Sequence, residues 1–168
     1  MTAALTVRPA TPQDAPAMTE IYNEGIADRV ATFETHPRSV DDVIAWFAPD
    51  RPIVVVTDAQ RQVAGYAATF SYADRCCYAG IAEFSVYVRR SHRGQGVGAK
   101  AMEALIEAAA KAGYWKLLSR VFVENTASLT LLDRVGFRRV GVHEKHGKLD
   151  GTWRDVVAVE RVLEANLG

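Results

Sequence analysis

The segment Arg93-Gly94-Gln95-Gly96-Val97-Gly98 has the composition of a loop that binds phosphate. It follows a run of alternating apolar residues that ends at Val88, and it precedes an Ala-rich amphipathic segment, residues 98–112. Glycine lets the backbone turn sharply and approach a ligand closely. The free N–H groups and the positive dipole end of the following helix favour an anion at the same point. The segment is therefore predicted to hold a pyrophosphate group.

Two common phosphate-binding motifs do not fit this loop. A dinucleotide fingerprint reads G-x-G-x-x-G in an early βαβ unit, whereas Gly94, Gly96 and Gly98 alternate and lie past the middle of the chain. A Walker loop reads G-x-x-x-x-G-K-[ST], but Ala99 follows Gly98 here and Arg93 occupies the position of the first glycine. The remaining pattern is R-x-x-G-x-G after a strand. A glycine-rich turn that only joins strand to helix has the same letters, and this alternative stays open.

Glu83 is the second candidate, because it is an acid inside an apolar and aromatic run. Strand alternation places Glu83, Ser85 and Tyr87 on one face, and Phe84 and Val86 on the other. A carboxylate in such surroundings costs free energy unless it is paired. Two interpretations follow. The acid either pairs with an arginine at a strand edge, or it serves as a general base.

Composition excludes several classes of function. The 168 residues suit one domain, expected over residues 1–168, with 49% apolar residues and a net charge of zero. No block of like charges favours a nucleic-acid partner, and no apolar run is long enough for a membrane span. Residues 1–7 lack a basic region followed by a long apolar core, so they are not expected to form a secretory signal. Cys76 and Cys77 are adjacent and poorly placed to bridge each other, which predicts a reduced, cytoplasmic protein. The four histidines show no metal-ligand spacing, so no metal is expected.

Periodicity and turn residues predict an α/β protein. The expected strands cover residues 5–8, 53–57, 62–71, 79–89, 116–123, 137–142 and 153–162. Helices are expected to begin at Thr11 and Ser39, and to cover residues 98–112 and 127–135. Residues 143–152 are polar and punctuated by glycine, which predicts a loop. The order β-α-α-β-β-β-α-β-α-β-β implies a mixed sheet of about seven strands, mostly antiparallel in its first half, flanked by about four helices.

The loop, the element order and one further segment together resemble the GNAT superfamily of N-acetyltransferases. That segment is Asn125-Thr126-Ala127-Ser128, followed by Leu131 and Gly136-Phe137. The resemblance implies the GNAT fold and acetyl-CoA as cosubstrate. It also implies that the backbone groups of Val86 and Val88 pair with the pantetheine arm of acetyl-CoA. The implied cofactor-binding residues are Val86, Val88, Arg93, Gly94, Gln95, Gly96, Val97, Gly98, Ala99, Asn125 and Ser128.

Two positions of this pattern leave questions open. Asn125 either caps the following helix or directs its amide to the pantetheine arm. Leu132 stands where many relatives carry a tyrosine or histidine, the proposed proton donor to the departing thiolate. Leucine cannot donate a proton, so the thiolate leaves unprotonated or takes its proton from water or another residue.

Further segments resemble the phosphinothricin, methionine sulfoximine and arsinothricin acetyltransferase group. They include Ile21-Tyr22-Asn23, Ala31-Thr32-Phe33-Glu34, and Gly151-Thr152-Trp153-Arg154-Asp155-Val156. This group acetylates the α-amine of toxic glutamate-like amino acids, so a small amino-acid substrate, direct attack in a ternary complex, Glu83 as catalytic base and a homodimer are implied. The implied substrate-binding residues are Phe33, Glu34, Phe70, Arg75 and Tyr78. The segment after Arg75 departs from the group, because Cys76-Cys77-Tyr78 stands where relatives carry other residues.

Two other functions remain in competition with this one. The first is an acetyltransferase of the same fold that acts on another small amine or a peptide N-terminus. The second is a coenzyme-A-binding sensor without turnover, which Leu132 favours and Glu83 opposes.

Overall fold

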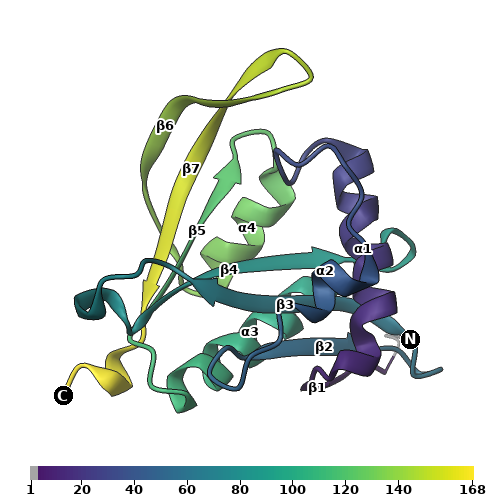
Figure 1. The fold of residues 1–168 in the computed structure, drawn as a ribbon, viewed down its shortest axis with the longest axis horizontal. Coiled ribbons are helices and arrows are strands. Elements are labelled where there is room, and N and C mark those ends of the chain that lie inside the picture. The colour runs from purple at the N-terminus through teal and green to yellow at the C-terminus, as the bar shows by residue number, and fades with distance from the viewer. Residues whose placement is uncertain (1–3) are drawn as a thin grey trace.

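The computed structural model describes residues 4–168, and a single seven-stranded sheet organises them (Figure 1). The strand order is β1-β2-β3-β4-β5-β7-β6. The strands are β1 (Thr6–Pro9), β2 (Ile53–Thr57), β3 (Val63–Ser71), β4 (Ile81–Val88), β5 (Lys116–Phe122), β6 (Arg138–Leu149) and β7 (Thr152–Val162). The α-helices are α1 (Ala15–Asp28), α2 (Val40–Ile44), α3 (Val97–Lys111) and α4 (Thr126–Arg134). The predicted order of elements is confirmed.

The two faces of the sheet have separate cores. Helices α3 and α4 cover one face, where Phe84 and Phe137 pack with their ring centroids 4.8 Å apart, beside buried Met102 and Leu105. Helices α1 and α2 cover the other face, over the fully buried Tyr66 and its neighbours. Side chains of β4 alternate between these two cores as the sequence predicts, so Phe84 faces α3 and α4 while Tyr87 faces α1.

Strands β4 and β5 separate after a short parallel contact. Only three residue pairs join them, Ile81 with Lys116, Ala82 with Leu117, and Glu83 with Leu118. Beyond Glu83, β4 continues alongside β3, whereas β5 turns away together with β7 and β6 (Figure 1). The facing backbone groups of β4 and β5 are therefore free of sheet pairing beyond this point.

The expected loop at residues 143–152 is wrong. Strand β6 continues to Leu149 and β7 begins at Thr152, so only Asp150 and Gly151 form the turn, with φ values of 50° and 79°. Two central residues at positive φ suit a tight hairpin of right-handed twist. Nearly every residue of β6 is exposed, so the strand lacks the apolar alternation that marks a half-buried one. Its register also shifts between His143 and Gly147.

The N-terminal helix starts as predicted but through an extra turn. A 3₁₀ turn, Pro12–Asp14, precedes α1, and Thr11 and Asp14 form a capping box. Asp14 also accepts two hydrogen bonds from Arg8, at 2.8 and 2.7 Å, which ties β1 to the helix start. Among residues 4–168, no helix combines the length and the apolar character needed to cross a bilayer.

Candidate active site

The glycine loop joins β4 to α3 through a left-handed backbone. Gly94 and Gly96 have φ values of 77° and 82°, which strain any residue with a side chain. A Cβ atom at either position would meet no neighbour within 4 Å, so conformation rather than packing requires glycine there. The first helical hydrogen bond runs from Lys100 N to Gly96 O. The backbone N–H groups of residues 97–99 thus point out of the helix start, where an anion is favoured.

Gly98 has a different reason to be glycine. It is buried, and a Cβ atom there would collide with Leu131 of α4. The missing side chain therefore allows the start of α3 to approach α4 closely.

Asn125 caps α4, as one of its two predicted roles requires. Its Oδ1 accepts a hydrogen bond of 3.2 Å from Ser128 N. No hydrogen bond within residues 4–168 uses the side-chain nitrogen of Asn125, so the cap leaves its NH2 group free for a ligand. Leu132 is 1% exposed and belongs to the core between α3, α4 and the sheet.

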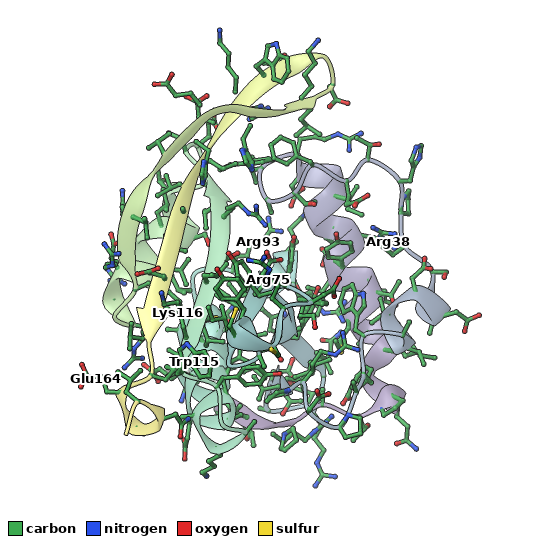
Figure 2. All side chains as sticks on the ribbon, turned by 60° about the vertical axis from the view of Figure 1, so that its left-hand side comes forward. Arg38, Arg75, Arg93, Trp115, Lys116 and Glu164 are labelled. Atoms are coloured by element: carbon green, nitrogen blue, oxygen red, sulfur yellow. The ribbon has the colours of Figure 1, made fainter. Side chains whose placement is uncertain are left out.

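The arginines near the loop are held by acids of α1. Arg93 lies 2.7 Å from Asp28, and Arg90 contacts the same carboxylate at 2.7 Å. Burial raises the pKa of Asp28, but hydrogen bonds from Arg90 and Arg93 outweigh this and leave the pKa lowered. Arg89 pairs with Glu20 at 3.0 Å. Of these cations, Arg93 stands directly before the glycines and also approaches Val88 O with its Nε, at 3.4 Å; Figure 2 labels it.

The edge of β4 beyond Glu83 presents backbone groups to the opening between the strands. Arg89 N donates to Ala64 O at 2.7 Å, and the antiparallel register continues unbroken along β3 and β4. In an antiparallel pair, the N–H and C=O groups of successive residues point alternately toward the paired strand and away from it. Every second residue of β4 therefore directs its backbone groups away from β3. Val86 and Val88 are those residues, so their N–H and C=O groups face the opening toward β5.

A pocket of about 330 Å³ lies at the point where the strands separate. Its walls come from the α1–α2 connection, β4, β5, β7 and the β6 end of the hairpin. The lining residues are Ala31, Thr32, Phe33, Glu83, Ser119, Arg120, Phe122, His146 and Val156. The volume is in the range of small-molecule sites, and Glu83 occupies the wall next to the opening.

Glu83 forms an ion pair with Arg120. Arg120 Nη2 donates to Glu83 Oε1 at 2.8 Å, and the two side chains are 47% and 31% exposed. The predicted pairing of this acid with an arginine is therefore present, although β4 is an internal strand and not an edge. Because the pair borders the pocket, it does not exclude the other interpretation, in which the carboxylate acts as a base.

The predicted substrate residues divide into two groups. Phe33 lines the pocket and packs edge-on against Phe122, with ring centroids 4.6 Å apart. Phe70 is the cross-strand partner of Glu83 and packs edge-on against Trp46 at 5.4 Å, beside the pocket wall.

Like Phe70, the other three predicted substrate residues lie outside the pocket lining. Glu34 pairs with Arg38 at 2.9 Å, and Figure 2 shows Arg38 on the α1 and α2 side of the molecule. Arg75 and Tyr78 lie on the exposed segment before β4, where Tyr78 packs edge-on against Tyr72. Cys76 and Cys77 form a 3₁₀ turn with Tyr78, and both are exposed and free.

Sequence reasoning missed Arg120, Phe122 and His146. Arg120 had a weak signal, since it is the one charged residue within the run Leu117–Phe122 of an otherwise largely apolar strand. His146 was hidden because its segment was expected to be loop. No local pattern indicates that these residues meet Glu83, because the meeting depends on the pairing of β4 with β5.

Residues 4–138 match the acetyltransferase (GNAT) domain family. The chain belongs to the GNAT acetyltransferases. A phosphinothricin N-acetyltransferase of Streptomyces coelicolor is 32% identical over 96% of this chain and 98% of its own. An L-methionine sulfoximine/L-methionine sulfone acetyltransferase of Pseudomonas aeruginosa is 32% identical over 94% of each chain.

Solved GNAT structures share the fold described above. A phosphinothricin acetyltransferase from Sinorhizobium meliloti, in complex with AcCoA, superposes with a TM-score of 0.88 at 29% identity, over 97% of this chain and 89% of its own. The predicted GNAT fold and the resemblance to this group of acetyltransferases are thereby confirmed. The protein is an N-acetyltransferase.

Proposed function

We propose that this acetyltransferase uses acetyl-CoA to acetylate the α-amine of a small glutamate-like amino acid, of the phosphinothricin, methionine sulfoximine or arsinothricin type. The observation that carries the proposal is the position of Glu83. Its carboxylate stands where β4 and β5 separate, between the free edge of β4 and a pocket suited to a small molecule. The names of the relatives support an amino-acid acceptor.

The residues of the loop and the opening fit acetyl-CoA. The pantetheine arm is extended and carries amide groups, so it can pair with Val86 and Val88 as an added strand would. The pyrophosphate would bind the N–H groups from Gly94 to Ala99, including Gln95 and Val97, where the loop leaves open space around both left-handed glycines. Arg93, the free amide of Asn125 and Ser128 would complete the site. An N–H group of the β4 edge would polarise the thioester carbonyl.

Glu83 would act as the general base. An α-ammonium group must lose a proton before its nitrogen can attack a thioester carbonyl. In the proposed step the ammonium group first loses one proton to the Glu83 carboxylate, directly or through water. The neutral nitrogen then forms the C–N bond, the C–S bond breaks to release the coenzyme A thiolate, and the second proton of the nitrogen passes to water. Leu132 is buried and apolar, so we assign protonation of the thiolate to water.

Thiol release measures this reaction directly. Coenzyme A formation from acetyl-CoA would be followed with phosphinothricin, methionine sulfoximine, arsinothricin, glutamate and methionine as acceptors. We expect turnover with at least one analogue, lost in Glu83→Gln. Glu107→Gln is the matched control, because Glu107 is exposed on α3 and its only ion pair among residues 4–168 is with Lys111, at 3.1 Å. Tight acetyl-CoA binding without turnover of any of these acceptors would favour the alternative acceptors or the sensor.

We further propose a cytoplasmic homodimer that contains the β6–β7 hairpin in its interface. Val140, Val142 and Trp153 are large apolar side chains exposed on this hairpin, and β6 is an edge strand. Such a surface suits burial against a second copy. Light scattering of the wild type and of Val142→Lys tests this, since a dimer that uses this surface should dissociate in the variant. The free Cys76 and Cys77 agree with a reducing compartment.

A further inference from the structure

We infer that Arg120 binds the α-carboxylate of the acceptor, so that Arg120 and Glu83 together recognise the zwitterionic head group of an α-amino acid. The inference rests on the proposed function and names the residue that would select α-amino acids over other amines. It starts from the charges of the pocket. Of the described residues that line it, Arg120 alone carries a permanent positive charge, and Glu83 alone is an acid.

The sheet brings these two side chains together. Glu83 and Leu118 are partners in the parallel register, and Arg120 follows two residues later on the same face of β5. Leu117 and Val121, which flank Leu118 and Arg120 in sequence, belong to the α3–α4 core and fix the orientation of the strand. Arg120 is also the backbone partner of Ala158 in β7. The guanidinium therefore reaches Glu83 from a strand that is held on its other side.

The ion pair leaves both partners with unused capacity. Only one contact joins them, Nη2 of Arg120 to Oε1 of Glu83 at 2.8 Å. Within residues 4–168, no hydrogen bond reaches Oε2 of Glu83 or any other N–H group of Arg120. A guanidinium has five N–H donors in a planar fork that suits a carboxylate. Both side chains are partly exposed to the pocket, so a ligand has access to the free donors and the free acceptor.

The charges of the pair are complementary to an amino-acid head group. An α-amino acid carries an ammonium and a carboxylate on one carbon, so its two charges lie as close together as those of Glu83 and Arg120. With the head group bound, the carboxylate would take the free side of Arg120 and the ammonium would face Oε2 of Glu83. Each charge then keeps an opposite partner, which offsets the cost of removing water from the pocket.

Other cations are less suited to this task. Arg75 lies on the exposed segment outside the pocket lining. Arg38 is paired with Glu34. Arg154 does not line the pocket; its guanidinium carbon lies 5.7 Å from the centre of the Phe122 ring and its Nη1 lies 3.6 Å from Glu124. These positions leave Arg120 as the cation next to the base.

The experiment compares acceptors with and without an α-carboxylate. The best amino-acid acceptor of the wild type and its α-carboxamide would be assayed with the wild type, Arg120→Met, Arg120→Lys and the control Arg134→Met, at an exposed arginine in the last turn of α4. Loss of charge-assisted hydrogen bonds of the usual strength corresponds to about 10- to 150-fold. We expect Arg120→Met to raise KM for the amino acid by such a factor and to leave KM for the carboxamide within about twofold. Arg120→Lys, which keeps the charge but loses the fork, should give an intermediate KM.

The outcomes separate this inference from the proposed function. If the wild type turns over no α-amino acid, or prefers amines without a carboxylate, the proposed function fails and the inference falls with it. If amino acids are substrates but Arg120→Met changes KM for both acceptors equally, or for neither, only the inference is overturned. A purely structural ion pair gives the equal change. Thermal unfolding and acetyl-CoA titration of each variant show that the fold and the cosubstrate site persist, and Arg120→Lys carries the test if Arg120→Met does not fold.

Discussion

Gly96→Ala separates the conformational role of the glycine loop from its packing. Gly96 has a φ of 82°, and a Cβ atom there would touch nothing within 4 Å. The substitution therefore introduces backbone strain without a collision, at a cost of about 1–2 kcal/mol. If the loop keeps its shape, the protein loses that stability. If the loop relaxes, its N–H groups no longer converge and acetyl-CoA binding weakens by about fivefold for each 1 kcal/mol.

Gly113→Ala is the matched control. Gly113 has a φ of 97° and equally open surroundings, but it lies at the far end of α3, away from the loop. Both variants should lower the melting temperature by roughly 2–4 °C per kcal/mol for a chain of this size. Only Gly96→Ala should weaken acetyl-CoA binding, measured by titration calorimetry. A Gly96→Ala variant that keeps the wild-type melting temperature has a relaxed loop, and an unchanged acetyl-CoA affinity in such a variant would refute the assignment of this loop to the cosubstrate.

Three other substitutions test separate parts of the argument. Glu83→Gln should lower kcat by about 10²–10⁴-fold and leave the acetyl-CoA affinity unchanged. Coenzyme A release measures kcat, and calorimetry measures the affinity. A change in acetyl-CoA affinity alone would contradict the role of Glu83 as base. Asp14→Asn should cost about 1.5–3 kcal/mol at pH 7 in urea unfolding. Hydrogen bonds from Arg8 lower the pKa of Asp14, so its contribution is present above the unfolded pKa and lost as the pH falls through the folded one; a loss equal at pH 7 and at pH 2 would contradict this. Gly80→Ala should destabilise the protein more than Gly113→Ala, because its Cβ would collide with the Trp115 ring, and equal melting temperatures would show that the ring moves aside.

The parts of the site that follow one another in the chain were predictable. A strand, three alternating glycines and a helix are adjacent in sequence, so the position of the loop and of its left-handed residues follows from local chemistry. Glu83 stands out for a similar reason, since period-two alternation within a single strand assigns it to the face opposite Phe84. The order of helices and strands along the chain was likewise predictable from patterns that repeat within each element.

The contacts between elements were not predictable in this way. The pairing of β4 with β5 stops at Glu83 and Leu118, and no residue in either strand marks that point. The partner of Glu83 therefore had to be read from the structure. The long β6–β7 hairpin escaped prediction for a different physical reason. Because β6 is exposed along nearly all of its length, burial imposes no apolar alternation on it, and the turn Asp150-Gly151 is the single local sign.

The separation of β4 from β5 links the two halves of the proposed reaction. Parallel pairing up to Glu83 holds the Glu83 carboxylate and Arg120 of β5 in a fixed relation, while the loss of pairing beyond Glu83 frees the backbone of Val86 and Val88. If pairing continued, the opening for pantetheine would be filled by sheet hydrogen bonds. If it stopped earlier, Arg120 would be drawn away from Glu83. The proposed acceptor pocket and the proposed thioester site therefore meet at the pair Glu83 and Leu118. Among the described residues, Glu83 is the only acid that lines the pocket. This placement explains why one carboxylate can serve both in recognition of the ammonium group and in removal of its proton.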